Sequence, residues 1–190
     1  MQAQVALGAA GDDAARDHAL RYTLAGCDRA TRLVEQLLTL ARLEGQQAAA
    51  GASTCDAAKV VRGVVAELAP SALAKKQALE LDAPQACTLA VGDTLLGVLA
   101  RNLVDNALRY SPPGAQVQVA VAVTGDVITL QVDDSGPGLD EPSLQKLGER
   151  FFRVLGTAQS GSGLGWSIVR RIAQVQGASV VVQRSRTLGG

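Results

Sequence analysis

The chain has 190 residues, of which 47% are hydrophobic and 19% charged, a composition that fits a globular protein and excludes a disordered or fibrous one. Its 18 basic and 18 acidic residues cancel, so no basic excess is present to bind a nucleic-acid backbone. The cysteines are odd in number and far apart, which indicates reduced cytoplasmic thiols rather than disulfides or a zinc site.

The first part of the chain predicts a helical hairpin with one long amphipathic helix. Apolar side chains recur at alternating steps of four and three from Leu20 to Ala41, and a second row at Leu33, Leu37 and Leu40 widens the stripe. A stripe of this width suits a four-helix bundle. A shorter apolar stretch over residues 5–10 predicts the other helix. Because two helices cannot enclose such a core alone, we expect a homodimer through residues 20–41.

Beyond an uncharged segment without periodicity, which we interpret as a linker, the pattern changes. It predicts a helix over 59–75, an extended segment over 78–81, and a helix over 94–110 with Asp93 as its N-cap. Residues 117–123 alternate in period two and, with 127–132, predict an antiparallel hairpin. A short helix near Leu144, a helix over 164–176 and a strand over 179–183 follow. Helices mixed with antiparallel strands indicate an α+β fold.

The helix over 94–110 carries an unusual polar strip. Asn102 and Asn106 lie one turn apart and Arg109 continues the strip, although asparagine favours helices only weakly. One interpretation is a solvated helix edge on which Asp105 and Arg109 form an ion pair. The other is a strip that faces a ligand, where an asparagine oxygen binds Mg²⁺ and phosphates and water complete the coordination.

A second polar group, Asp134, ends a predicted strand and is followed by Gly136 and Gly138. Aspartate and glycine are common in turns, so a strand-terminating turn explains them without a function. Alternatively, the carboxylate accepts from the amine of adenine and repels the carbonyl oxygen of guanine, while the glycines let a ring approach the backbone.

A third feature is a glycine-rich segment directly before the helix over 164–176. N–H groups exposed at a helix start bind phosphates well, although such a segment is also a common flexible connection. It has neither the lysine of a P-loop nor the spacing of a dinucleotide fingerprint. Its residues are Gly161, Ser162, Gly163, Leu164 and Gly165.

The order of these features resembles bacterial two-component sensor histidine kinases, in particular the QseC-like group. Residues 102–110 resemble the N-box of that family, 134–138 the G1 box, 149–153 the F-box and 161–165 the G2 box. Residues 28–44 resemble the second helix of its dimerisation domain. All four boxes occur in family order, and the resemblance covers nearly the whole chain.

The resemblance implies a two-layer α/β sandwich of the gyrase, Hsp90, histidine kinase and MutL type. It assigns residues 1–46 to a partial dimerisation domain, 47–54 to a linker and 55–190 to the ATP-binding catalytic domain. Asn106 would bind Mg²⁺ with Asn102 nearby, and Asp134 would accept from adenine. Arg109 would lie near the phosphates and Tyr110 near the base. The glycines of the G2 box would let a lid close, and Arg153 would steady the transferred phosphoryl group.

The sequence departs from the family pattern in three places. The only histidine, His18, is not followed by the acidic residue and proline of the family's H-box, and the alignment of motifs places the phosphorylated histidine about a dozen residues before Met1. Trp166 stands where the family has a smaller aliphatic residue. The final strand of the fold is truncated, which would expose a sheet edge.

We therefore expect a chain that binds Mg²⁺ and ATP but does not label itself, with a response regulator as its downstream partner. No run of about 18 apolar residues is present, so we expect a cytoplasmic chain whose parent is anchored in the inner membrane by upstream segments. Two alternatives remain: a non-catalytic dimerisation fragment of such a kinase, or an ATPase of the gyrase, Hsp90 or MutL branch, which does not use this dimerisation helix.

Overall fold

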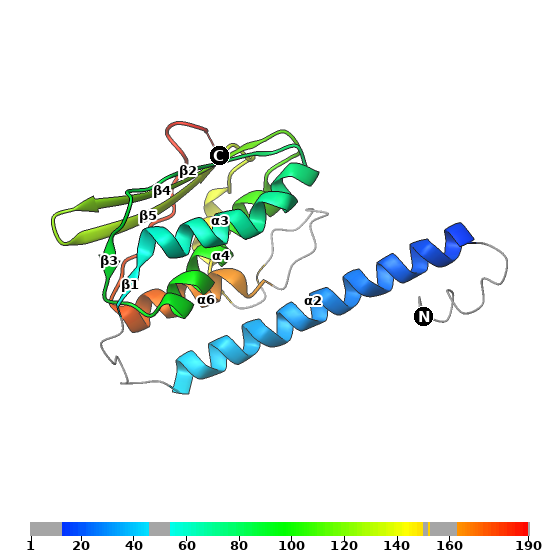
Figure 1. Cartoon of the computed structure of the whole chain (residues 1–190), viewed down its shortest axis with the longest axis horizontal. Coiled ribbons are helices and arrows are strands. Elements are labelled where there is room, and N and C mark those ends of the chain that lie inside the picture. The colour runs from blue at the N-terminus through cyan, green and yellow to red at the C-terminus, as the bar shows by residue number, and fades with distance from the viewer. Residues whose placement is uncertain (1–12, 46–53, 150–151, 153–162, 190) are drawn as a thin grey trace. The chain divides into compact units, whose positions relative to one another are not determined.

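The computed structural model describes residues 13–45, 54–149, 152 and 163–189, which divide between two compact units, residues 1–42 and 43–190 (Figure 1). The described part of the first unit belongs to a single helix, α2 (Asp13–Gly45), which confirms the long predicted helix. Four large apolar side chains of its stripe are exposed: Leu20, Leu24, Val34 and Leu38. The shorter helix predicted over residues 5–10 and most of the predicted linker lie outside the described residues.

The second unit is built on a mixed sheet in the order β2-β4-β5. β2 (Ala78–Asp82) runs parallel to β4 (Gln116–Thr124), and β4 runs antiparallel to β5 (Val127–Asp134). Thr124 pairs with Val127, so Gly125 and Asp126 form a two-residue turn, with Gly125 at φ +59°. A turn residue with positive φ gives the two-residue turn a backbone twist that matches the right-handed twist of the two strands. The predicted hairpin is thus confirmed.

Two helices, α3 (Ala57–Ala74) and α4 (Asp93–Tyr110), cover one face of this sheet, and α6 (Gly165–Gln176) packs against α4 (Figure 1). α4 lies at the centre, in contact with α3, α6, β4 and β5. The alternate valines of β4 meet α3 and α4 in a core whose best buried members include Val61, Ala100, Val104, Val117 and Val119. One layer of helices on one layer of sheet is the predicted α+β sandwich, which is therefore confirmed. The short helix α5 (Glu141–Lys146) has no buried residue.

Polar caps fix both ends of α3. Asp56 is its N-cap and accepts from the N–H groups of Lys59 and Cys87, each at 3.2 Å. These bonds, that from Cys87 first, lower the pKa of the Asp56 carboxyl. At the other end Lys76 adopts φ +55°, while its own N–H and that of Gln77 bond back to Leu73 and Ala72. This is a Schellman turn with lysine where glycine is usual. At the start of α3, the hydrogen bond between Asp56 and Cys87 ties the helix to a small antiparallel ladder of β1 (Cys55–Asp56) and β3 (Thr88–Leu89), which the sequence did not predict.

Two sequence predictions are wrong. Gly92, in an extended conformation, is the N-cap of α4, and Asp93 is already helical, its carboxylate accepting from the N–H of Thr94 at 2.7 Å. Residues 179–183 form no strand, and Val181 is 78% exposed. Three consecutive valines, residues 180–182, favour an extended backbone, whereas a strand also needs a neighbouring backbone with which to pair.

A helix that crosses a bilayer must be long and almost entirely apolar. Within residues 13–45, 54–149 and 163–189, none combines the length and the apolarity that a membrane crossing needs.

Candidate functional site

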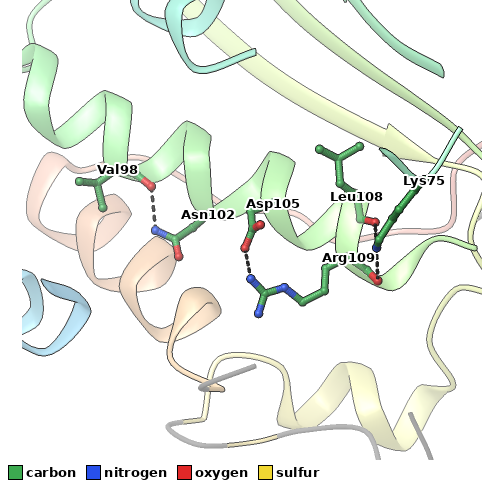
Figure 2. A network of polar contacts seen from close by, with 6 residues as sticks. All are labelled: Lys75, Val98, Asn102, Asp105, Leu108 and Arg109. Atoms are coloured by element: carbon green, nitrogen blue, oxygen red, sulfur yellow. Dashed lines mark hydrogen bonds and ion pairs between the residues drawn. The ribbon is translucent and has the colours of Figure 1, made fainter. Parts of the chain in front are cut away.

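The polar strip of α4 is a partly buried surface. Asn102 is only 9% exposed, and its Nδ2 donates to the carbonyl of Val98 at 2.8 Å (Figure 2). Asn106, one turn on, has a buried Nδ2 that finds no hydrogen-bond partner in the described part of the chain. A buried amide without a partner is rare because it costs free energy. The Asn106 amide is therefore a donor of this strip that lacks an acceptor among the described residues.

The start of α6 lies against both asparagines. A Cβ added to Gly165 would lie 3.1 Å from Oδ1 of Asn102 and 3.5 Å from both amide atoms of Asn106. A larger residue at this position would crowd the Asn102 amide by a few tenths of an ångström. The cap residue of α6, Leu164, is fully buried and supplies no side-chain hydrogen bond. The first N–H groups of α6 therefore offer the positive end of a helix dipole next to the two amides, an arrangement that suits phosphates.

A third group gathers where β5 ends. Oδ1 of Asp134 accepts from the N–H of Gly136 at 2.8 Å and from the hydroxyl of Ser111 at 3.1 Å. Ser111 directly follows α4 and is 1% exposed. The end of α4 is therefore joined to the end of β5 through a carboxylate. Asp134 and Gly136 lie together at this point, and Ser111, to which the sequence pattern gave no role, joins them.

The remaining residues of α4 complete one side of the helix. Arg109 forms an ion pair with Asp105, on the same side as Asn102 (Figure 2). The ion pair of the solvated-edge interpretation is thus present, but the burial of Asn102 and of the Asn106 amide shows that the strip is more than a solvated edge. Tyr110 ends the helix and is partly exposed.

The glycine-rich segments are described only in part. Gly138 and Gly163 adopt φ +69° and +70°, a region that favours glycine. Gly161, Ser162 and Arg153 lie outside the described residues. Trp166, the departure from the family pattern, is partly buried and lines a hollow of about 190 Å³ with Leu144, Leu147, Arg170, Val180 and Val182.

Two polar residues near the site escaped the sequence analysis. Gln77 and Lys75, in the turn between α3 and β2, donate to the last carbonyl groups of α4. Neither lies in a motif, and no local pattern signals a glutamine that is 5% exposed. Only the contact across the fold reveals them.

The comparisons decide the family. Residues 92–190 match the family model described as "Histidine kinase-, DNA gyrase B-, and HSP90-like ATPase". The chain belongs to this family. That assignment agrees with the four ordered boxes and with the sandwich fold, and it confirms the prediction of an ATP-binding catalytic region of the histidine kinase type.

Its relatives within the family are sensor kinases. The chain is 39% identical over 181 residues to the sensor protein QseC of Salmonella typhi, covering 95% of the chain and 39% of that protein. It thus spans well under half the length of that relative. The solved cytoplasmic segment of histidine kinase QseC is similar at 30% identity and a TM-score of 0.54, over 85% of this chain and 88% of that one. Histidine kinase AdeS of Acinetobacter baumannii shares the fold, with a TM-score of 0.67 at 23% identity over 92% of this chain and 80% of that one.

The described residues can be compared with what a Mg²⁺ site requires. Among the described residues there is no group of three or more histidine, cysteine, aspartate or glutamate side chains that could hold a metal ion. A neutral amide beside a helix start fits a different arrangement, in which a hard cation takes most of its oxygen ligands from phosphates and water.

Proposed function

We propose that this chain is the catalytic region of a sensor histidine kinase, which binds Mg²⁺ and ATP and transfers the γ-phosphate to a histidine supplied by another segment. One observation carries the proposal: the start of α6 lies against Asn102 and Asn106, where a buried amide has no partner in the described residues. A helix start next to amides is suited to the phosphates of a nucleotide.

Different residues of the site are proposed to bind the base, the metal ion and the phosphates of the nucleotide. Asp134 accepts from the amine of adenine, with Gly136 and Gly138 beside the ring and Tyr110 near the base. Asn106 would hold Mg²⁺ through its side-chain oxygen Oδ1, and the bound cation would neutralise charge on the phosphates. Asn102 lies next to Asn106 in this site, and Arg109 lies near the phosphates. We assign the lid to the G2 box and the steadying of the transferred group to Arg153.

We further propose the domain assignment and the partners. Residues 1–46 form a partial dimerisation domain, 47–54 a linker and 55–190 the catalytic domain. The exposed apolar side chains of α2, Leu20, Leu24, Val34 and Leu38, support a homodimer, because such a stripe is normally buried against another helix. The receiver domain of a response regulator is the downstream partner. The parent protein is proposed to sit in the inner membrane with this part on the cytoplasmic side.

The ATP site is tested by following Trp166 fluorescence during titration with Mg²⁺ and ATP, since this tryptophan adjoins Gly165. We expect a saturable change that is lost in Asp134→Asn and Asn106→Ala. Asp133→Asn is the matched control, because Asp133 accepts from Gln131 at 2.6 Å and successive strand residues face opposite sides. A chain that keeps its fold but binds no ATP would favour the dimerisation-fragment alternative.

Phosphotransfer is tested by incubating the chain with labelled ATP, alone and mixed with a histidine kinase dimerisation domain that carries the acceptor histidine. Label on the added domain supports transfer. We propose that His18, which is exposed on α2 and followed by Ala19-Leu20-Arg21, is an ordinary surface residue. Label on this chain would contradict that assignment.

A further inference from the structure

The carboxylate of Asp134 is held by one of its two oxygens. Oδ1 accepts both the Ser111 hydroxyl at 3.1 Å and the Gly136 N–H at 2.8 Å. No described residue donates a hydrogen bond to Oδ2. Two hydrogen bonds to one oxygen fix the orientation of the group and leave the other oxygen for a ligand N–H. The Ser111 hydroxyl must be the donor in its bond, since an ionised carboxylate only accepts.

Ser111 is itself held in place by the protein. It is 1% exposed, it leaves α4 in an extended conformation with φ −80° and ψ 143°, and its N–H bonds to the carbonyl of Ala107 at 3.1 Å. Its own carbonyl accepts from Nε2 of Gln77 at 3.0 Å. The serine therefore has little freedom to turn its hydroxyl away from Asp134.

Gln77 ties together the chain on both sides of that serine. The two N–H groups of its Nε2 are shared among three carbonyls, those of Leu108 at 3.0 Å and Pro112 at 3.1 Å in addition to that of Ser111. Lys75 adds a charged donor, with Nζ 2.8 Å from the carbonyl of Leu108 and 3.3 Å from that of Arg109 (Figure 2). The last carbonyls of a helix form its negative end and need donors, so these two side chains cap α4 from outside it.

We propose that Ser111 is the positioning residue that aims Asp134 at adenine, and that Gln77 acts one step back by fixing Ser111. The assignment rests on the proposed function, because it presumes that Asp134 reads the base. It extends adenine recognition to the turn between α3 and β2, which none of the four boxes contains. Removing the hydroxyl leaves one hydrogen bond to Oδ1 instead of two and frees the carboxylate to rotate.

The experiment compares two nucleotides by calorimetry: ATP, and purine riboside triphosphate, which lacks only the amine that Asp134 would bind. The native chain should prefer ATP. In Ser111→Ala the preference should fall about tenfold, through weaker ATP binding, because a hydrogen bond to a charged group is lost from the site that orients it. Purine riboside triphosphate should bind as before. Ser143→Ala is the matched control, because it removes a serine hydroxyl beside another carboxylate, that of Asp140, which accepts from the Ser143 N–H at 3.1 Å outside the site.

A second variant, Gln77→Leu, tests the step behind the serine. It keeps a similar volume but removes the donor to three carbonyls, so the preference for ATP should fall in the same direction while the fold is monitored by thermal melting. A drop in stability with unchanged preference would reduce Gln77 to a structural residue and overturn that step. Equal weakening of both nucleotides in Ser111→Ala, or no change in either, would overturn the role of Ser111. If the native chain binds neither nucleotide, the proposed function fails, and this assignment fails with it.

Discussion

Replacing Gly136 with alanine should disable adenine binding while the fold survives. The added Cβ would lie 2.6 Å from Oδ1 of Asp134 and 3.2 Å from the hydroxyl of Ser111, whereas ordinary contacts begin at 3.4 Å. The carboxylate oxygen would therefore have to retreat by about 0.8 Å, the difference between 3.4 and 2.6 Å. Gly136 does not have a positive φ, so alanine adds no backbone strain and the clash is the main effect.

The size of the effect follows from that displacement. The ligand bond is assigned to Oδ2, which moves with Oδ1 because the carboxylate is a rigid group. A shift of the same size would stretch a bond of about 2.9 Å to about 3.7 Å, which no longer counts as a hydrogen bond. Losing a hydrogen bond to a charged group costs about 1.5–3 kcal/mol, or about a 10- to 150-fold rise in the Kd for ATP. Binding of purine riboside triphosphate should change much less, because that nucleotide never makes the bond.

Calorimetric titration of both nucleotides measures the change, with Gly63→Ala as the matched control. A Cβ at Gly63 on α3 meets nothing within 4 Å, so this variant should bind ATP like the native chain and be more stable by about 1 kcal/mol. Native affinity for ATP in Gly136→Ala would refute the reasoning, because it would mean that adenine is not read by the Asp134 carboxylate.

Three further changes test other parts of the second unit. Gly165→Ala would place a Cβ 3.1 Å from Oδ1 of Asn102, a few tenths of an ångström too close, and should raise the Kd for ATP about three- to tenfold with stability nearly unchanged; unaltered affinity would argue against phosphates at this helix start. Lys76→Gly should raise the free energy of unfolding in urea by about 1 kcal/mol, since Lys76 sits at φ +55°; a loss of stability would show that its side chain matters more than its backbone. Asp56 stabilises the fold at pH values above the unfolded pKa of about 3.9, and this contribution is lost as the pH falls through its lowered folded pKa. Urea denaturation from pH 7 to pH 3 should therefore show a steeper loss of stability in the native chain than in Asp56→Asn, and parallel curves would contradict it.

The local patterns of the sequence were sufficient for most of the elements. Period two in residues 117–123 and a glycine at the turn are enough to specify the β4–β5 hairpin, because strand alternation and turn conformation are decided by near neighbours. The apolar spacing of α4 and α6 works in the same way. Local patterns were not sufficient for the strand predicted over 179–183, because a strand must pair with a neighbouring backbone that no local pattern can supply.

For the site, the sequence determined which residue types are available: two asparagines one turn apart, a carboxylate before glycines, and a glycine at a helix start. It could not determine that the backbone at Gly165 approaches both asparagines or that Ser111 donates to a carboxylate 23 positions away. Nor could it single out Gln77, which is an ordinary polar residue until burial places its amide against three carbonyls. These contacts join segments far apart in the chain, and only the packing of the helices on the sheet brings them within hydrogen-bond distance.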